Sequence, residues 1–209
     1  MTDSSTHCYK SGLLDAVLRL VLAWLLLACT LAHAQVQTEI SQLRVERSDD
    51  EWQLSAQLQF DMPSVVEDAL VKGIPMVFVI SADVVRERWY WYDKKLVAAE
   101  RFMRLAYQPL TRRWRLNVSS GAVVNSGVGL ALNQSFDTLN QALSAIKRVS
   151  KWKIADATEL DASGKFKLDF RFRLDLGQLP RPFQIGALGQ TDWDISANVL
   201  TPLVVESAK

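Results

Sequence analysis

The sequence predicts a mainly β protein, either an antiparallel β-sandwich or a curved sheet with two short covering helices. The clearest observation is the segment Lys165 to Leu176, in which polar and apolar residues alternate at every position. Such alternation is typical of a strand with one buried and one solvated face. Residues 40–61 have the pattern of a hairpin, and only two segments carry helix signals. Strands should therefore outnumber helices, which we expect to cover gaps or edges of the sheet.

The first half of the chain contributes three of the predicted strands. The hairpin at 40–61 turns at Asp49 and Asp50, and its second strand has an apolar residue at every second position from Trp52 to Phe60. The segment Met76 to Ala82 is apolar on both faces, which favours a central strand, and its continuation to Tyr92 becomes amphipathic.

The remaining strands follow further along the chain. A second hairpin is predicted from Arg101–Tyr107 and Thr111–Val118, which flank a turn at 108–110. The last two strand candidates are Val128–Leu132 and Trp193–Val205, the latter interrupted or ended by Pro202.

Two segments carry the start and stop signals of helices. Ser64 to Lys72 begins after Pro63 and ends before Gly73, with acidic residues near its start. Thr138 to Arg148 opens with the capping-box residues Thr138 and Gln141, and its basic C-terminal end suits the helix dipole. Its apolar stripe predicts that this second helix lies on a sheet.

The first 34 residues have the pattern of a secretory signal peptide. An unbroken apolar stretch, Leu20 to Ala32, ends in the small-x-small pattern Ala32-His33-Ala34. We expect cleavage between Ala34 and Gln35 and a location in the periplasm or cell envelope. Two alternatives stay open. An uncleaved segment would act as an anchor, although a bilayer-spanning helix needs about 20 apolar residues. Leu26-Leu27-Ala28-Cys29 resembles a lipobox, which would place a lipid on Cys29.

Residues 35–209 are expected to form a single β-rich envelope domain, because no linker, charge block or repeat divides them. Both cysteines and both histidines of the chain precede residue 35. The mature domain therefore lacks thiolate and imidazole groups, which excludes disulfides, Cys-His and Ser-His-Asp catalysis, and metal or haem sites that need those ligands. We predict no catalytic residues, no metal and no cofactor. The net charge of +1 gives no field that would attract nucleic acid.

Several short motifs follow one another from about residue 35 to 200. They are Gly73-Ile74-Pro75, Arg88-Trp89-Tyr90-Trp91-Tyr92-Asp93, Tyr107-Gln108-Pro109-Leu110-Thr111-Arg112, Asn133-Gln134-Ser135-Phe136, Leu179-Pro180-Arg181-Pro182-Phe183-Gln184 and Asp192-Trp193. In kind and order they resemble the DUF4390 family of proteobacterial exported proteins. The resemblance implies a signal peptide, an envelope location and no assigned catalytic residues. It also implies an association with membrane sensor systems, because family members are often encoded beside a sensor kinase.

The aromatic run at 89–92 is the most unusual segment of the chain. In a strand, Trp89 and Trp91 share one face while Tyr90 and Tyr92 share the other. Some of the four rings must therefore be exposed, or be covered by another element such as the proline segment Leu179 to Phe183. Trp, Tyr and Arg favour interfaces and carry binding hot spots. The candidate binding residues are Arg88, Trp89, Tyr90, Trp91 and Tyr92.

Three functions from different classes are compatible with these observations. The leading expectation is a non-catalytic interaction domain that contacts an envelope or inner-membrane protein, such as a membrane sensor. The alternative is a periplasmic carrier of lipophilic or glycan ligands. The third is an enzyme that uses carboxylates alone. Its candidate residues are Asp49, Asp50, Glu51, Asp156, Glu159, Asp161, Asp192 and Asp194. Ser144-x-x-Lys147 copies a serine-lysine pattern, but its companion motifs are absent. The oligomeric state does not follow from the sequence.

Overall fold

The computed structural model describes residues 38–48, 50–86, 94–120, 132–160, 165–187, 189–203 and 205–207. All of them belong to one compact unit, Gln37–Lys209. The predicted fold class is confirmed: the described residues form two sheets, accompanied by three short α-helices and two 3₁₀ turns. Among these residues, no helix has both the length and the apolar character needed to cross a bilayer.

The smaller sheet has four strands in the order β10-β1-β2-β7. Its strands are β1 (Glu39–Arg47), β2 (Glu51–Gln59), β7 (Arg148–Asp156) and β10 (Val205–Ser207). Neighbours are antiparallel except β1 and β10, which run parallel. The hairpin predicted at 40–61 is confirmed as β1 and β2.

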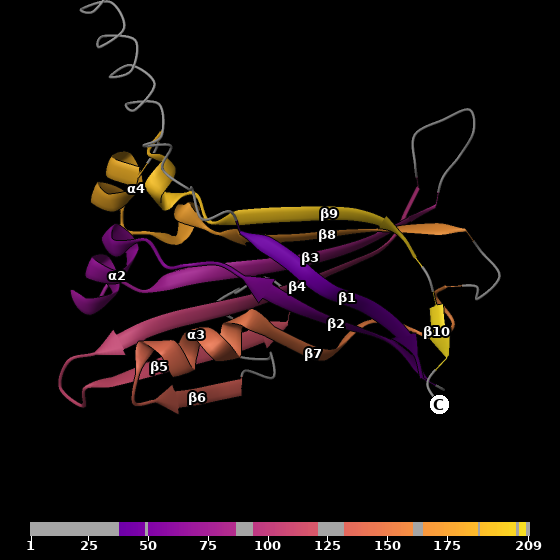
Figure 1. Ribbon diagram of the computed structural model, residues 1–209, viewed down its shortest axis with the longest axis horizontal. Coiled ribbons are helices and arrows are strands. Elements are labelled where there is room, and N and C mark those ends of the chain that lie inside the picture. The colour runs from indigo at the N-terminus through magenta and orange to yellow at the C-terminus, as the bar shows by residue number, and fades with distance from the viewer. Residues whose placement is uncertain are drawn as a thin grey trace, which may run out of the picture. The chain divides into compact units, whose positions relative to one another are not determined.

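The larger sheet has six antiparallel strands in the order β6-β5-β4-β3-β8-β9. They are β3 (Met76–Arg86), β4 (Lys94–Gln108), β5 (Arg113–Ser120), β6 (Leu132–Phe136), β8 (Phe166–Leu174) and β9 (Ser196–Pro202). In Figure 1, β1 and β2 cross the strands of this sheet at an angle. The alternation from Lys165 is confirmed as β8, and the second hairpin as β4 and β5.

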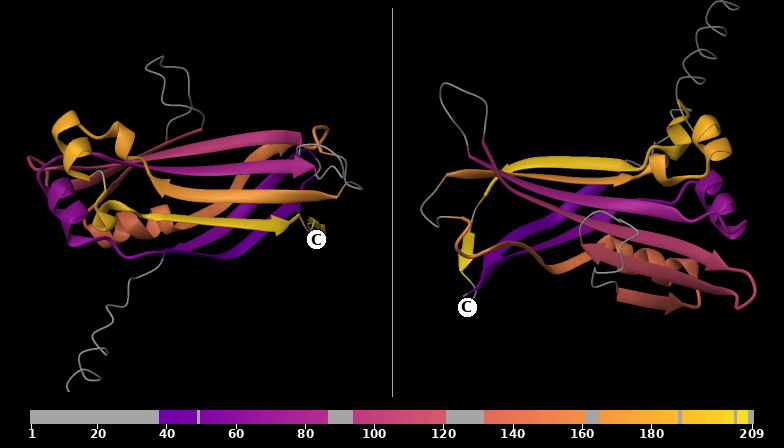
Figure 2. Two further views of the ribbon diagram at one scale, coloured as in Figure 1. Left: turned by 90° about the horizontal axis from the view of Figure 1, so that it is seen from above. Right: turned by 180° about the vertical axis from the view of Figure 1, so that it is seen from behind.

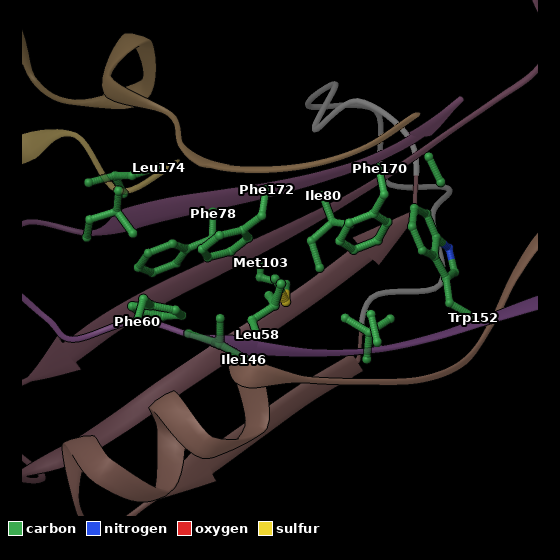
Figure 3. Close-up of a cluster of buried hydrophobic side chains, with 14 of the residues drawn as sticks. Leu58, Phe60, Phe78, Ile80, Met103, Ile146, Trp152, Phe170, Phe172 and Leu174 are labelled. Carbon is green, nitrogen blue, oxygen red and sulfur yellow. The ribbon is translucent and has the colours of Figure 1, made fainter. Parts of the chain in front are cut away.

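The core fills the space between the two sheets. Phe172 of β8 stacks on Phe78 of β3 with ring centroids 5.8 Å apart, and it lies 5.2 Å from Phe60, which follows β2. Figure 3 shows these rings together with Leu58, Ile80 and Ile146. Fully burying one such ring stabilises the fold by about 1.5–3 kcal/mol. The aromatic residues therefore join β2, β3 and β8 into one hydrophobic core.

One cation also lies on the inner face of the larger sheet. Arg101 of β4 stands opposite Ile80 and places its guanidinium 4.9 Å from the ring centroid of Trp152. Its Nε atom is buried without a hydrogen-bond partner, and burial lowers the pKa of the Arg101 guanidinium. Stacking on the indole ring offsets part of the cost of removing this charge from water.

The helices cover the ends and one side of the core. Helix α2 (Ser64–Val71) buries Val66, Ala69 and Leu70, and α3 (Leu139–Lys147) buries Ala142, Leu143 and Ile146. The third helix, α4 (Arg181–Ala187), lies at the same end of the sheets as α2, as the views in Figure 2 show. The 3₁₀ turns are η1 (Leu176–Gln178) and η2 (Thr191–Trp193).

Both predicted helices are confirmed, and their caps follow from the sequence. At α3, the Thr138 side chain accepts a hydrogen bond from the Gln141 backbone N–H at 3.3 Å, as a capping box requires. The Gln141 side chain, however, accepts from the N–H of Asp137 rather than of Thr138. At the end of α2, Gly73 N–H donates to Leu70 and Ile74 N–H to Ala69, which is the pattern of a Schellman motif.

The Schellman motif gives a first prediction. Gly73 has a φ of 86°, and a Cβ at this position would meet no atom within 4 Å. Gly73→Ala should therefore cost only the backbone strain of a left-handed residue, about 1 kcal/mol of unfolding free energy. Gly186→Ala is the matched control, because Gly186 lies in α4 with equal space and no positive φ. Urea denaturation of both variants measures the difference, and an equal cost at the two sites would refute the assignment of strain to Gly73.

Three features differ from the sequence expectations. β7 was not expected, and neither was α4, which includes part of the proline segment Leu179–Phe183. Trp193 was expected to begin a strand, but it ends η2, and β9 starts at Ser196. Residues 128–131 of the strand expected at Val128–Leu132 lie outside the described residues, and β6 begins at Leu132.

Candidate functional site

The outer face of the six-stranded sheet, the face turned away from the core, carries the candidate site. Its central strand β3 is buried on this face as well, where its side chains are Val77, Val79, Ser81 and Asp83. Larger side chains stand beside them, since Val79 lies between Phe102 and Arg173 in the register. Their stems cover the smaller residues of β3 while the charged groups reach water. The central position predicted for Met76–Ala82 is therefore confirmed.

A groove of about 470 Å³ opens on this outer face. A volume of this size is typical of sites that bind small molecules or short segments of other molecules. The groove runs across β3, β4, β5 and β6, and Gln178 of η1 also lines it. Its lining combines apolar and polar side chains: Pro75, Val77, Phe102, Arg104, Ala106, Arg115, Asn117, Ser119, Asn133 and Gln178.

Two arginines give the groove its charge. Arg104 of β4 pairs with Asn117 in the register, and Arg115 of β5 pairs with Ala106, so the two arginines are diagonal neighbours on one face. Among the described residues, no carboxylate forms an ion pair with either. Three other arginines do have such partners: Arg113 pairs with Asp137, Arg171 with Asp83 and Arg173 with Asp175. The groove therefore presents two guanidinium groups whose charge is not balanced within the described domain.

Neutral hydrogen-bonding groups surround these arginines. Asn117 donates to the side-chain oxygen of Asn133 across β5 and β6, at 2.7 Å. Gln178 reaches the groove from η1, which is held against β3 because Asp175 N–H donates to the Val77 carbonyl at 2.8 Å. Among the described residues, the lining has no carboxylate, lysine or tyrosine. It can therefore bind an anionic group through hydrogen bonds, but its own side chains include no group suited to general acid or base chemistry.

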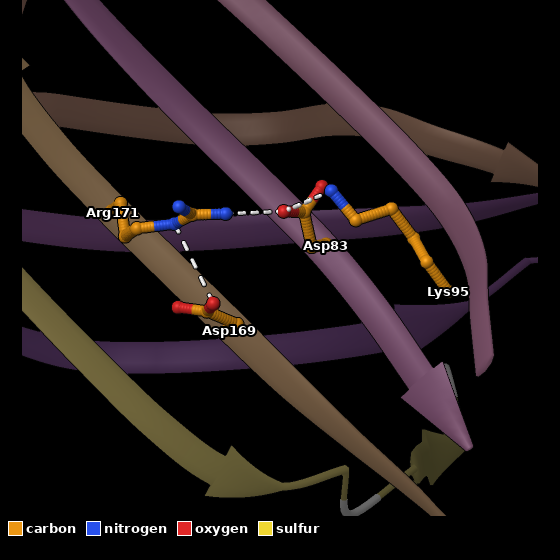
Figure 4. A network of polar contacts seen from close by, with 4 residues as sticks. All are labelled: Asp83, Lys95, Asp169 and Arg171. Carbon is orange, nitrogen blue, oxygen red and sulfur yellow. Dashed lines mark hydrogen bonds and ion pairs between the residues drawn. The ribbon is translucent and has the colours of Figure 1, made fainter. Parts of the chain in front are cut away.

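A network of charges occupies the other end of the same face (Figure 4). Asp83, only 4 % exposed, accepts from Lys95 Nζ at 2.7 Å and forms an ion pair with Arg171. Arg171 also lies 3.5 Å from a carboxylate oxygen of Asp169. Because the two cations offset the charge of the buried carboxylate, we interpret this network as structural support that joins β3, β4 and β8.

The candidate binding residues Arg88, Trp89, Tyr90, Trp91 and Tyr92 lie outside the described residues, and so does the expected cleavage site at Ala34 and Gln35. The described residues beside the aromatic run are Arg86, where β3 ends, and Lys94, where β4 begins. The proline segment Leu179–Phe183 follows η1 at the other end of β3, near Val77.

Of the carboxylates considered for an enzyme, Glu51 and Asp156 lie opposite each other in the β2–β7 register and share the ammonium of Lys153. Asp156 and Glu159 line one hollow of about 460 Å³, but Asp156 accepts a hydrogen bond from Lys153 at 2.6 Å. This bond raises the pKa of Lys153. Asp194 accepts from Ser196. Asp49 and Asp161 lie outside the described residues. No group of three acidic, histidine or cysteine residues in the described ranges is placed to hold a metal ion.

The serine and lysine of the 144–147 pattern have other partners. Ser144 donates to the backbone carbonyl of Asn140 at 2.7 Å, as helical serines often do. The Lys147 ammonium lies 4.9 Å from the ring centroid of Phe60. Both side chains therefore have structural roles.

Sequence reasoning missed Arg104 and Arg115. Both occupy polar positions of alternating strands, where a charged residue is the ordinary occupant of a solvated face. Nothing in the linear sequence shows that they share a groove, because that depends on the β4–β5 register and on the position of η1. The available signal was the cluster of basic residues on either side of the turn at 109–112.

Comparison with known proteins identifies a family and adds no named activity. The model of the family described as Domain of unknown function (DUF4390) matches residues 35–201. The chain therefore belongs to the DUF4390 family. No curated protein and no solved structure matches it significantly.

Proposed function

We propose that this member of the DUF4390 family is a non-catalytic interaction domain of the cell envelope, and that it binds an anionic part of a partner protein in the groove on its six-stranded sheet. The observation that carries the proposal is the pair Arg104 and Arg115. Both line the groove, and neither has an acidic partner among the described residues. Arginine is favoured where carboxylates are recognised, because its planar group donates two parallel hydrogen bonds.

The rest of the lining supports binding to a protein. Phe102 and Ala106 offer apolar contact area, while Ser119 and Gln178 offer further hydrogen bonds. Protein interfaces combine these two kinds of contact, with arginine and aromatic residues enriched at their centres. The partner we propose is an envelope or inner-membrane protein, consistent with the exported character expected from residues 1–34.

The proposal is tested by photo-crosslinking in the cells that make the protein. A photoreactive amino acid at Ser119 lies in the groove, and one at Gln57, a half-buried position of β2 that faces away from the core, serves as the control. We expect one dominant protein adduct from position 119 and none from position 57.

A pair of double variants identifies the contribution of the groove charge. Arg104→Ala/Arg115→Ala should reduce the adduct about tenfold or more, because each charge-assisted hydrogen bond contributes about 1.5–3 kcal/mol. Arg44→Ala/Arg148→Ala is the matched control, since these exposed arginines lie opposite Ser55 and Gln57 on the smaller sheet. Equal adducts from positions 119 and 57, or an adduct that both double variants leave unchanged, would contradict the proposal.

A further inference from the structure

The outermost strand of the six-stranded sheet, β6, is an open edge. Its sequence, Leu132-Asn133-Gln134-Ser135-Phe136, has no charged residue and no proline. Leu132 is 64 % exposed, and the strand has a hydrogen-bonded neighbour among the described residues only on the β5 side. In Figure 1, β6 forms the border of the sheet below α3. An edge of this kind presents unpaired backbone groups that another strand can join.

The other sheet edges in the described part of the chain are protected. β7 contains two register shifts and four charged residues, β10 has three residues, and β9 ends at Pro202 and lies beside β1. Charge, bulges, proline and short length are the devices that prevent edge pairing. Of these edges, β6 and β9 combine a regular register with an uncharged sequence, and of the two only β6 contains no proline.

The open edge and the arginine pair belong to one surface. Asn133 lines the groove, and Ser135 pairs with Arg115 in the β5–β6 register. A strand added beside β6 would lie about 10 Å from β5, because neighbouring strands are about 4.8 Å apart. Ser135 is small, so the long Arg115 side chain can extend across it toward an acidic side chain on the added strand.

We propose that an extended acidic segment of the partner protein pairs with β6 as a seventh strand and places its carboxylates toward Arg115 and Arg104. This inference rests on the proposed function and specifies how the partner is bound. Backbone hydrogen bonds to β6 supply affinity, and alternate side chains supply specificity. In the added strand, the residues that face the outer side of the sheet are acidic and those that face the inner side are apolar. The apolar residues lie beside Leu132, which is paired with Val118 on the inner face.

The experiment uses the full-length protein as its cells produce it and three synthetic peptides. The probe is acetyl-VEVEVEV-amide, which alternates apolar and acidic residues. One control replaces glutamate by lysine, and the other is N-methylated at every peptide bond, so that it keeps the charges and loses every backbone donor. Binding is followed by NMR titration and by the hydrogen exchange of amides 132–136.

We expect saturable binding of the acidic peptide, with chemical-shift changes along residues 132–136 and slower exchange at the alternate amides that face away from β5. The lysine and N-methylated peptides should bind about tenfold more weakly or worse, and so should the acidic peptide to Arg104→Ala/Arg115→Ala. Arg44→Ala/Arg148→Ala should bind like the unchanged protein.

The outcomes separate this inference from the proposed function. If the N-methylated peptide binds as well as the acidic one, the seventh strand is wrong, while an anionic partner in the groove still holds. Absence of peptide binding together with a Ser119 adduct in cells also overturns the seventh strand alone. Loss of both the peptide and the adduct overturns the inference and the proposed function together.

Discussion

Phe172→Ala should remove about 3–5 kcal/mol of unfolding free energy, which is near the upper end of the range for a single substitution. Phe172 is buried and contacts the rings of both Phe78 and Phe60, so its truncation leaves a cavity among β2, β3 and β8. Domains of this kind have a total stability of about 5–15 kcal/mol, so the loss is a large part of it. Urea denaturation followed by tryptophan fluorescence measures the change.

Phe183→Ala is the control for this prediction. Phe183 carries the same side chain, but it is 37 % exposed on α4 and lies outside the buried core. Its truncation should cost well under half as much, because less surface is returned to water and no closed cavity forms. A similar loss at the two positions would show that the Phe60, Phe78 and Phe172 cluster does not dominate the stability of the domain.

The second large effect concerns the charge network on the outer face. Asp83 is buried, whereas about half of the Lys95 and Arg171 side chains is exposed. Removing both cations leaves a buried carboxylate that nothing balances, and Lys95→Met/Arg171→Met should cost about 3 kcal/mol or more. Asp83→Asn should cost only about 1 kcal/mol, because the two exposed cations remain solvated.

The asymmetry between these variants is the measurable result. Arg44→Met/Arg148→Met removes two exposed cations from the smaller sheet, where neither has an ion-pair partner in the described residues, and should be nearly neutral. Thermal and urea unfolding of the three variants ranks them by their loss of stability. If Asp83→Asn lowers the unfolding free energy as much as the loss of both cations does, the need to balance a buried carboxylate does not explain the contribution of the network to stability.

The elements that the sequence predicted correctly are those whose patterns are local. The alternation from Lys165 was sufficient for β8, because every inward residue of that strand is buried. The second helix was recognisable from Thr138 and its apolar stripe, both of which act within a few residues of chain. In these segments, the local period and the tertiary packing agree.

β7 was not predicted because bulges interrupt its alternating pattern. The strand has a shift opposite Ser55, where Lys151 adopts a φ of 44° and its N–H donates to the Ser55 hydroxyl, and a second shift near Ile154. Its buried residues are therefore Val149, Trp152, Ile154 and Ala155, a spacing with neither a strand nor a helix period. Only pairing with β2 defines this strand, and pairing cannot be read from one segment.

α4 was not predicted because two prolines lie at its start. Pro180 and Pro182 suggested an irregular segment, but proline is tolerated in the first turn of a helix because the N–H groups there have no intrahelical partner. The Pro180 carbonyl accepts the N–H of Phe183 and of Gln184, which starts the helix. The groove was not predicted from the sequence for a different reason. Residues of four strands and η1 form it, and no single segment contains it.

The most direct test of the central claim is the affinity of the captured partner for Arg104→Ala/Arg115→Ala, compared with Arg44→Ala/Arg148→Ala. Both double variants remove two positive charges, and they differ in the sheet from which the charges are removed. A groove that binds an anionic partner predicts a loss of about tenfold or more for the first variant and no change for the second. Equal affinity of the two variants would contradict the claim and move the binding surface elsewhere on the domain.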